Sequence, residues 1–213
     1  MATTMKNVVL IDHPLVKRDL TLLRNKKTPS NLFRAVLRRT ASLMAYEVTR
    51  DLQLKRISVL TPLEKTTGHE VVGPVVLVPI LRAGLGLVGG FVEVLPDARV
   101  GHIGIYRDEN TLTPVDYYAK FPRNLGGALI LILDPMLATG GSATAAVTFL
   151  KAKGARNIRF VSLVAAPEGI RALTRAHPDV RIYTCAVDRR LDSRGYILPG
   201  LGDAGDRIFG TAE

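Results

Sequence analysis

Two different patterns of apolar residues divide the chain near residue 70. Between residues 28 and 52, apolar side chains recur at close to helical spacing and leave an opposite polar face. The residues of this apolar stripe are Leu32, Phe33, Val36, Leu37, Leu43, Met44, Val48 and Leu52. We therefore predict an amphipathic helix here, with Thr28 as its N-cap and Pro29 in its first turn. A shorter helix is predicted from residue 15 to residue 24.

Beyond residue 70, short β-branched runs alternate with stretches of helical pattern. The runs predicted as strands are residues 75–80, 100–105, 129–133, 158–164 and 180–186. The stretches predicted as connecting helices are residues 84–95, 142–153 and 168–176. Continuous apolar runs are typical of strands that are covered on both faces. The pattern therefore predicts an α/β fold, with a central, mostly parallel sheet flanked by helices and joined by right-handed crossovers.

Two segments depart from this alternation. Residues 106–124 are polar and aromatic and are broken by Pro114 and Pro122, which favours a projecting β-arm or flexible loop. Residues 195–211, GYILPGLGDAGDRIFGT, are rich in glycine and acids and cannot be one regular element. They are either a shaped functional loop or a surface connection. The length favours one domain over two, covering residues 1–213.

Composition narrows the class of protein. No apolar run approaches the roughly 20 residues of a membrane-spanning helix, and the N-terminus lacks the pattern of a secretory signal. We therefore expect a cytoplasmic protein with no membrane partner. Cys185 is the single cysteine, which excludes an internal disulfide and favours a buried, unreactive thiol. The four histidines are scattered and show no metal-ligand spacing.

Positive charge is concentrated near the N-terminus. The net charge is +10, and residues 1–60 hold 12 Lys and Arg against 4 acids. Such an excess attracts nucleic acid or a phosphorylated ligand, and it also occurs on the solvated face of a helix. No nucleic-acid-reading motif accompanies the charge, so we do not expect nucleic acid to be a main partner.

The stretch LILILDPMLATGGS, residues 129–142, carries the clearest sign of chemistry. A buried strand ends before Asp134, and a Thr-Gly-Gly-Ser turn leads into the next predicted helix. Gly140 and Gly141 let backbone N–H groups approach a ligand, while Thr139 and Ser142 add hydroxyl donors at a helix N-terminus that favours an anion. The loop lacks the lysine and spacing of a Walker A motif. Its shape alone indicates either a phosphate-binding loop or a tight connection without a ligand.

An apolar strand, an acid and then Ala-Thr-Gly-Gly-Ser resemble the phosphoribosyl pyrophosphate loop of the type I phosphoribosyltransferases. Most of that family has two acids in succession. Here Pro135 replaces the second acid, as in the DPMLATGGS signature of the uracil-specific branch, the uracil phosphoribosyltransferases. The resemblance implies the type I phosphoribosyltransferase fold, with a hood from N- and C-terminal segments, and a loop that binds the 5′-phosphate and the ribose. The loop residues are Asp134, Pro135, Met136, Leu137, Ala138, Thr139, Gly140, Gly141 and Ser142.

Two arginines are expected to bind the pyrophosphate of the substrate. Arg82 follows a strand in VPILRAGLG, where α/β folds place ligands, and it matches a pyrophosphate-binding arginine of the branch. Without the resemblance, a surface arginine at a strand end would be the simpler interpretation. Arg107, in IGIYRDENTLTP, matches the second such arginine. On a mobile arm it would act catalytically by closing over the leaving group and excluding water.

The C-terminal loop is similar to the uracil-recognition loop of the same branch. The resemblance places Ile197, Gly202, Asp203 and Ala204 against uracil, within a hood of about residues 188–206, with Asp203 also near phosphoribosyl pyrophosphate. Main-chain groups complement the alternating donors and acceptors of the uracil edge. The sequence departs from the branch at Asp192, where asparagine is usual, so the packing of the hood stays open.

The resemblance implies an enzyme of pyrimidine salvage that makes UMP and pyrophosphate from uracil and phosphoribosyl pyrophosphate. Mg²⁺ is the expected cofactor, bound mainly through the substrate, and the expected proton acceptor is Asp203 or a bound water. GTP is a candidate activator, and a homodimer or larger homo-oligomer is expected. Two alternatives stay open: a transferase for a purine base, and a phosphoribosyl pyrophosphate sensor that binds nucleic acid without catalysis.

Overall fold

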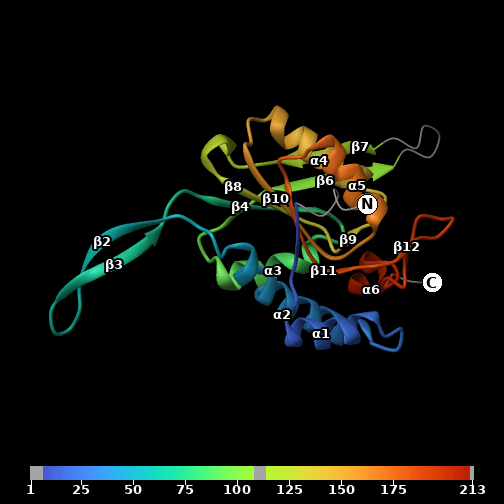
Figure 1. Ribbon diagram of the computed structural model, residues 1–213, viewed down its shortest axis with the longest axis horizontal. Helices are drawn as coiled ribbons and strands as arrows, with labels where there is room; N and C mark the ends of the chain where they lie inside the picture. The colour runs from blue at the N-terminus through green and yellow to red at the C-terminus, as the bar shows by residue number, and fades with distance from the viewer. Residues whose placement is uncertain (1–6, 108–113, 212–213) are drawn as a thin grey trace.

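The structure of the chain is a computed structural model that describes residues 7–107 and 114–211 (Figure 1). The strands of its main sheet are β1 (Val8–Leu10), β4 (Val75–Leu81), β5 (Arg99–Val100), β6 (His102–Arg107), β7 (Pro114–Lys120), β8 (Leu129–Leu133), β9 (Met136–Leu137), β10 (Asn157–Ala165) and β11 (Arg181–Val187). They run in the order β1-β11-β10-β8-β4-β6-β7, with β5 beside β4 and β9 beside β10. Every pairing is parallel except that of β6 with β7. The predicted central, mostly parallel sheet is confirmed.

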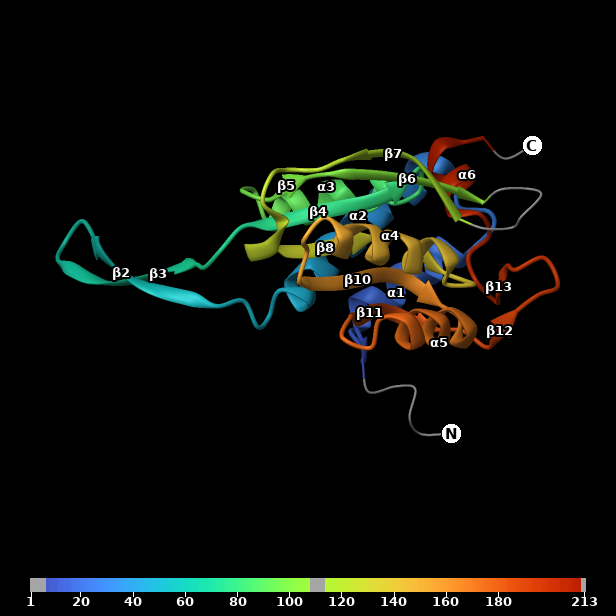
Figure 2. The same cartoon turned by 90° about the horizontal axis from the view of Figure 1, so that it is seen from above.

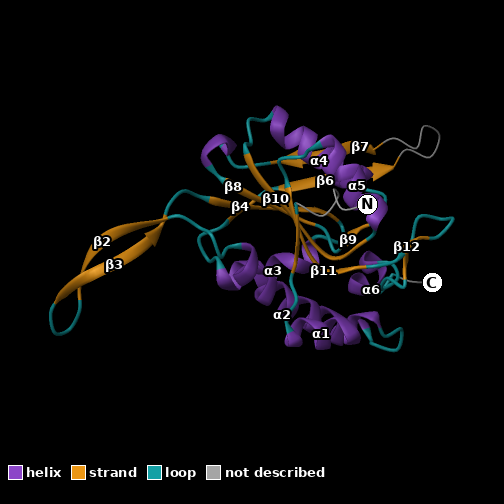
Figure 3. Cartoon of the chain, viewed as in Figure 1, coloured by secondary structure: helices purple, strands orange, loops and turns teal. Residues whose placement is uncertain are grey.

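Helices cover both faces of this sheet (Figure 3). The helices on one face are α1 (Pro14–Arg24), α2 (Ser30–Val48), α3 (Leu85–Val94) and the short α6 (Ala204–Phe209). Those on the other face are α4 (Gly141–Ala152) and α5 (Pro167–Ala176). Leu131 of β8 enters the first core and its neighbour Ile130 the second, which explains why all of β8 is buried. None of the helices in the described residues is long and apolar enough to cross a membrane.

The predicted elements are present, with differences at their ends. Beyond residue 70 the strands and helices begin and end within one or two residues of expectation, except that Gly101 separates β5 from β6. Thr28 does not cap α2. Its hydroxyl donates to the carbonyl of Leu22 at 2.7 Å, and Pro29 takes the N-cap position without a side-chain hydrogen bond. Cys185 is buried as predicted, and burial raises the pKa of its thiol to about 12.

A hairpin of β2 (Leu54–Leu60) and β3 (Lys65–Val71) stands clear of the body (Figure 2). Within the described residues its strands pair with each other and with no other strand. The sequence predicted an arm at residues 106–124 and made no prediction for the β2–β3 hairpin. In the predicted region β7 pairs with β6 and extends the main sheet, and the connecting residues 108–113 lie outside the described part.

The order of the strands determines where a ligand can bind. From β4 the chain passes to β6 on one side and then returns to β8 on the other side of β4. Such a reversal is a topological switch point, and ligands of open α/β sheets bind beside it at the carboxyl ends of the strands. β4 ends at Leu81 and β8 at Leu133, so Arg82 and Asp134 follow neighbouring strands at this edge.

Candidate substrate-binding site

The loop between β8 and α4 is held against the edge of the sheet. Asp134 donates its N–H to the carbonyl of Val161 at 3.1 Å. The carbonyl of Pro135 accepts from the N–H groups of Leu163 and Val164, at 3.0 and 3.2 Å. β9 then pairs with the end of β10. These bonds fix the loop backbone before it turns toward α4.

The turn into α4 has the form of a phosphate-binding loop. Gly140 has a φ of +85°, and a Cβ there would lie 2.8 Å from Cβ of Ala172 and 2.9 Å from the carbonyl of Gly169 in α5. Glycine is therefore required. The Thr139 hydroxyl accepts from the N–H of Gly141 at 3.4 Å. The turn encloses a hollow lined by Asp134, Met136, Leu137, Ala138, Thr139, Gly140, Gly141, Ser142 and Ala143. N–H groups at the start of α4 suit an anion in this hollow.

Asp134 is an acid in an unfavourable electrostatic environment. Burial raises the pKa of its carboxyl from 3.8 to about 7. The N–H of Met136 lowers that pKa by donating to Oδ1 at 3.5 Å, and the charge of Asp203 raises it. Two predicted site residues that are distant in sequence therefore interact. A hydrogen-bond donor or a cation from a ligand would favour the charged form of Asp134 at neutral pH.

Arg82 follows β4 where the backbone approaches β8 closely. A Cβ on Gly84 would lie 2.3 Å from the carbonyl of Leu133, so a larger residue does not fit there. The guanidinium of Arg82 is exposed, with Nη2 3.4 Å from Oδ1 of Asp206 and Cζ 5.9 Å from the centre of the Phe209 ring. Ion pairs this exposed contribute at most about 1 kcal/mol, so a more highly charged ligand can displace Asp206.

The hood contains a small hairpin of β12 (Arg190–Leu191) and β13 (Ile197–Leu198). Asp192 closes its turn, because Oδ1 accepts from the N–H groups of Tyr196 and Arg194, both at 2.9 Å. These bonds lower the pKa of Asp192, that from Tyr196 most strongly. The carboxylate oxygen fills the acceptor role that an asparagine side chain also fills in turns of this kind. The departure from the family pattern is therefore accommodated within the hood.

The turn of this hairpin lies beside the loop between β8 and α4. A Cβ on Gly195 would lie 3.6 Å from the side-chain methyl of Thr139. Between the two segments is a hollow of about 210 Å³, lined by Met136, Ala138, Arg194, Gly195, Tyr196, Ile197 and Asp203. The hollow thus joins the predicted loop to the predicted hood. Arg194 and Tyr196 were not predicted as site residues, although Tyr196 directly precedes Ile197 in the matched segment.

The four residues predicted to contact uracil lie on one short stretch, but they differ in what they expose. The side chains of Ile197 and Ala204 are buried, so these residues can offer mainly backbone groups. Gly202 is exposed and has a φ of +77°. Asp203 is also exposed and caps α6, where Oδ1 accepts from the N–H of Asp206 at 3.0 Å.

The hood also meets the arginine that follows β4. A Cβ on Gly205 would lie 3.2 Å from Oδ1 of Asp203 and 3.9 Å from Nη2 of Arg82. Arg82, Asp134 and Asp203 are therefore gathered at one edge of the sheet. Arg107 is the last residue of β6, but its side chain lies outside the described part of the structure, so its role stays a prediction.

The acids at this edge can contribute to a metal site only together with other ligands. Among the residues that the structure describes, no three His, Cys, Asp or Glu side chains gather as a metal site. Asp134 and Asp203 nevertheless interact, and carboxylate oxygens are ligands that Mg²⁺ prefers. This pair fits an ion held largely by the oxygens of a substrate.

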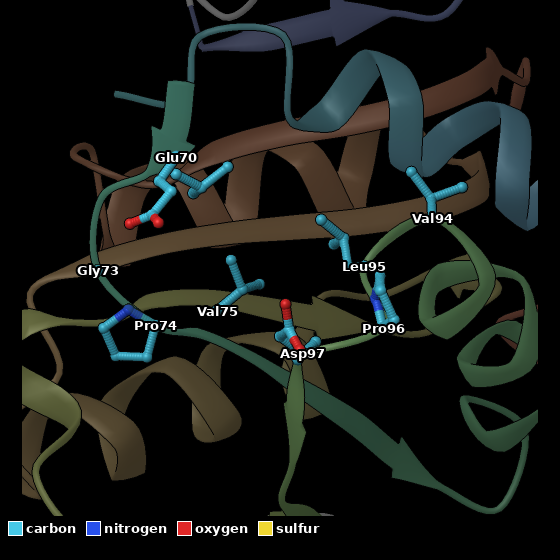
Figure 4. Close-up of a pocket in the computed structure, with 10 residues that line it drawn as sticks. Glu70, Gly73, Pro74, Val75, Val94, Leu95, Pro96 and Asp97 are labelled. Atoms are coloured by element: carbon cyan, nitrogen blue, oxygen red, sulfur yellow. The ribbon is translucent and has the colours of Figure 1, made fainter. Parts of the chain in front are cut away.

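A larger hollow, of about 470 Å³, lies at the opposite end of the strands (Figure 4). It is lined by Glu70, Val71, Gly73, Pro74, Val75, Val94, Leu95, Pro96, Asp97 and Ala98. Val75 begins β4, so this hollow is far from the carboxyl ends where Arg82 and Asp134 lie. Its walls are mostly apolar and its charged side chains are acids, which disfavours a phosphate group.

The chain matches one family model and curated proteins that share its name. A family model described as uracil phosphoribosyltransferase matches residues 9–211. The chain is 59% identical over 208 residues to the uracil phosphoribosyltransferase of Polaromonas naphthalenivorans, covering 97% of this chain and 100% of that protein. It is 54% identical over 209 residues to the protein of the same name from Salinibacter ruber, covering 98% of this chain and 100% of the relative.

Solved structures agree with this result. A protein from Aquifex aeolicus, 36% identical, superposes with a TM-score of 0.91 over 96% of this chain and 99% of its own. A hypoxanthine phosphoribosyltransferase from Trypanosoma cruzi, 15% identical, superposes with a TM-score of 0.51 over 74% of this chain and 75% of its own. The second likeness concerns the fold alone, and it confirms the predicted type I phosphoribosyltransferase architecture.

Proposed function

The chain belongs to the uracil phosphoribosyltransferase family, and on this premise we propose how its residues transfer the phosphoribosyl group to uracil. The observation that carries the proposal is the meeting of residues 134–142, Arg82 and residues 197–204 at the switch-point edge of the sheet. The sequence relatives favour uracil over a purine base and catalysis over a sensor role. The cytoplasmic location stays a prediction.

We assign the sugar phosphate to the loop between β8 and α4. The N–H groups at the start of α4 and the hydroxyls of Thr139 and Ser142 would donate to the 5′-phosphate. Asp134 would accept from the ribose hydroxyls. Its raised pKa supports this role, because a carboxyl that lacks strong donors of its own is stabilised when a ligand supplies them.

We assign the pyrophosphate to Arg82, with Arg107 as the second arginine. Arg82 is exposed at the switch point and is paired with Asp206 by a single long contact of 3.4 Å. The fork of its guanidinium matches two phosphate oxygens at once, and a pyrophosphate carries more charge than the carboxylate it would displace. Neutralising that charge as the C1′–O bond breaks is the main electrostatic contribution expected of the protein.

Uracil would lie under the hood, in the hollow shared with Met136 and Ala138. The bond from uracil N1 to C1′ forms while the bond from C1′ to pyrophosphate breaks, and N1 gives up its proton. We assign that proton to Oδ2 of Asp203, because Oδ1 already accepts from the N–H of Asp206. The proton then passes to solvent, to which Asp203 is exposed. Backbone groups at Ile197, Gly202 and Ala204 would hold the polar edge of the base.

Mg²⁺ is proposed as the cofactor, held through substrate oxygens beside Asp134 and Asp203. When bound, it supplies positive charge that neutralises the leaving pyrophosphate. Holding the base and the sugar within reach of one another is left to the loop and the hood. Activation by GTP remains a prediction.

A homodimer is proposed in which the β2–β3 hairpin contacts a second copy. An isolated two-stranded hairpin is marginally stable in water. This one nevertheless exposes apolar side chains, with Leu60 and Leu63 near its tip 81% and 95% exposed. The apolar hollow of Figure 4 lies at its base, where Glu70 and Val71 form part of the wall. An apolar projection and an apolar groove on one molecule suit the reciprocal contacts of a two-fold dimer.

The first experiment measures UMP formed from labelled uracil, phosphoribosyl pyrophosphate and Mg²⁺, with and without GTP. Arg82→Ala is expected to lower kcat/KM for phosphoribosyl pyrophosphate by about 100-fold, because it removes a charged phosphate contact. Arg50→Ala is the matched control, since Arg50 is also an exposed arginine in a surface ion pair and lies far from the site. Equal activity of the two variants would contradict the Arg82 assignment.

The role of Asp203 is tested in the same assay. Asp203→Asn keeps an oxygen that can accept from Asp206 but removes the proton acceptor. We expect kcat to fall by about 100-fold, as is common when a general base is lost. Turnover close to that of the wild type would leave Asp203 as a structural cap only.

A further inference from the structure

We propose that Arg24 and Asp188 are positioning residues that determine how the hood presents its base-binding stretch to uracil. Neither residue is among those assigned above to the substrates, although Asp188 lies at the start of the hood. Arg24 is the last residue of α1, and Asp188 follows β11. The inference rests on the proposed role of residues 197–204 in binding uracil.

The two side chains form a bidentate pair that is largely shielded from solvent. Nη2 of Arg24 donates to Oδ1 of Asp188 at 2.7 Å, and Nη1 donates to Oδ2 at 2.8 Å. The side chain of Asp188 is 6% exposed and that of Arg24 is 24% exposed. Paired in this way, the guanidinium and the carboxylate fix each other in orientation as well as in charge.

The pair holds both polar groups of Gly200. The N–H of Gly200 donates to Oδ2 of Asp188 at 2.9 Å, and its carbonyl accepts from Nη1 of Arg24 at 2.7 Å. Gly200 has a φ of +60°, and a Cβ there would lie 2.2 Å from the carbonyl of Ile197. The backbone is therefore held in a conformation that requires glycine, two residues before Gly202.

A second arginine holds the next carbonyl. Nη1 of Arg207 donates to the carbonyl of Leu201 at 2.8 Å, and Nη2 donates to that of Asn25 at 2.7 Å. Nη1 also donates to the carbonyl of Leu23. The guanidinium lies 4.4 Å from the centre of the Phe33 ring. The end of α1 and residues 200–201 are thus joined through two partly buried arginines, Arg24 and Arg207.

Within residues 197–204, these contacts hold the backbone of Gly200 and Leu201 in place and leave the remaining residues to contact the base. The polar backbone groups of Gly200 and the carbonyl of Leu201 have protein partners, so recognition of the base falls to Ile197 before them and to Gly202, Asp203 and Ala204 after them. Small displacements of a group that orients a substrate lower the rate strongly. A loss of the Arg24–Asp188 pair should therefore affect uracil far more than phosphoribosyl pyrophosphate, whose loop is held separately on β10.

The test is steady-state kinetics with each substrate varied in turn. Arg24→Lys keeps the positive charge but has no planar guanidinium that could donate to both Asp188 and the carbonyl of Gly200. Asp188→Asn keeps one oxygen acceptor but loses the ion pair with Arg24. We expect KM for uracil to rise about tenfold in both variants, with KM for phosphoribosyl pyrophosphate within about twofold of the wild type. If Asp188→Asn fails to fold, Arg24→Lys alone decides.

Asp51→Asn is the matched control. Asp51 also bridges arginines, Arg159 at 2.7 Å and Arg181 at 3.0 Å, but these lie at the amino ends of β10 and β11, away from the site. This variant should leave both KM values unchanged. An equal rise for both substrates in Arg24→Lys, or no rise in a folded protein, would overturn the positioning role.

Gly202→Ala separates this inference from the assignment of the base site. If Gly202→Ala raises KM for uracil and Arg24→Lys does not, the hood binds uracil but Arg24 does not position it. If neither variant changes KM for uracil, the proposed base site is wrong, and the positioning role is overturned with it.

Discussion

At the scale of single residues, the carboxyl of Asp134 lies in an environment that disfavours its charged form. It follows a buried strand, its carboxyl has a pKa near 7, and the charge of Asp203 opposes its ionisation. The folded protein therefore retains a proton on Asp134 between about pH 4 and pH 7 that the unfolded chain has already lost. Stability must fall as the pH rises through this range, because the folded state binds more protons than the unfolded state.

Asp134→Asn should remove this dependence from the ligand-free protein. The free energy of unfolding of the variant minus that of the wild type is expected to be about 2 to 3 kcal/mol larger at pH 8 than at pH 5, since asparagine carries no buried charge. Urea denaturation at both pH values measures the gain. The same difference at pH 5 and pH 8 would contradict the raised pKa. UMP formation should fall even though stability rises.

At the scale of elements, α5 can contact the loop before α4 only because residue 169 of α5 is a glycine, which has no side chain. A Cβ on Gly169 of α5 would lie 2.4 Å from the carbonyl of Ala138 and 2.7 Å from that of Leu137. Distances that short cannot be relieved by a flexible side chain, because both neighbours are backbone atoms. α5 therefore packs directly against the backbone of the loop that we assign to the sugar phosphate.

Gly169→Ala is expected to displace the loop. We predict a rise in KM for phosphoribosyl pyrophosphate of about tenfold or more and a loss of about 1 to 3 kcal/mol in stability, as for other overpacked sites. Gly127→Ala is the control, because nothing lies within 4 Å of a Cβ at that position. Activity assays and thermal unfolding of both variants make the comparison. Identical behaviour of the two would show that the loop tolerates a shift of α5.

At the scale of the whole molecule, the β2–β3 hairpin is set apart because its strands pair only with each other within the described residues. It stands clear of the body of the molecule (Figure 2), and the leucines at its end are exposed. A second copy that covers these side chains would supply the burial that the isolated chain lacks.

Leu60→Asp with Leu63→Asp should shift the protein from dimer to monomer. Burying two carboxylates in an apolar contact costs far more than leaving them in water. Sedimentation velocity at several concentrations measures the change, with Leu15→Asp as a control on an exposed leucine of α1. A wild-type protein that is monomeric at all concentrations, or a double variant that stays dimeric, would reject the hairpin as the interface.

The sequence by itself determined the class of fold and marked the loop at residues 134–142 that we assign to the sugar phosphate. Both can be recognised from residues that are close together in the chain. Buried strands appear as continuous apolar runs, and the loop at residues 134–142 combines an acid, two glycines and two hydroxyls within nine residues. Such signals need no knowledge of distant contacts. The matched segments around Arg82 and Asp203 likewise predicted the remaining parts of the proposed site, and the structure brings them to the same edge of the sheet.

The tertiary structure decided what depends on residues far apart in the chain. Arg24 and Asp188 are 164 residues apart, and nothing near either one predicts that they meet or that Gly200 lies between them. Thr28 has a local signal for an N-cap, yet its hydroxyl donates to Leu22 instead. The hairpin at residues 54–71 was equally hidden in the sequence, because its strands lack a buried face whose pattern could be recognised. The periodicity of apolar residues in the sequence predicts which side chains are buried, but which residues they contact depends on how the helices and strands pack.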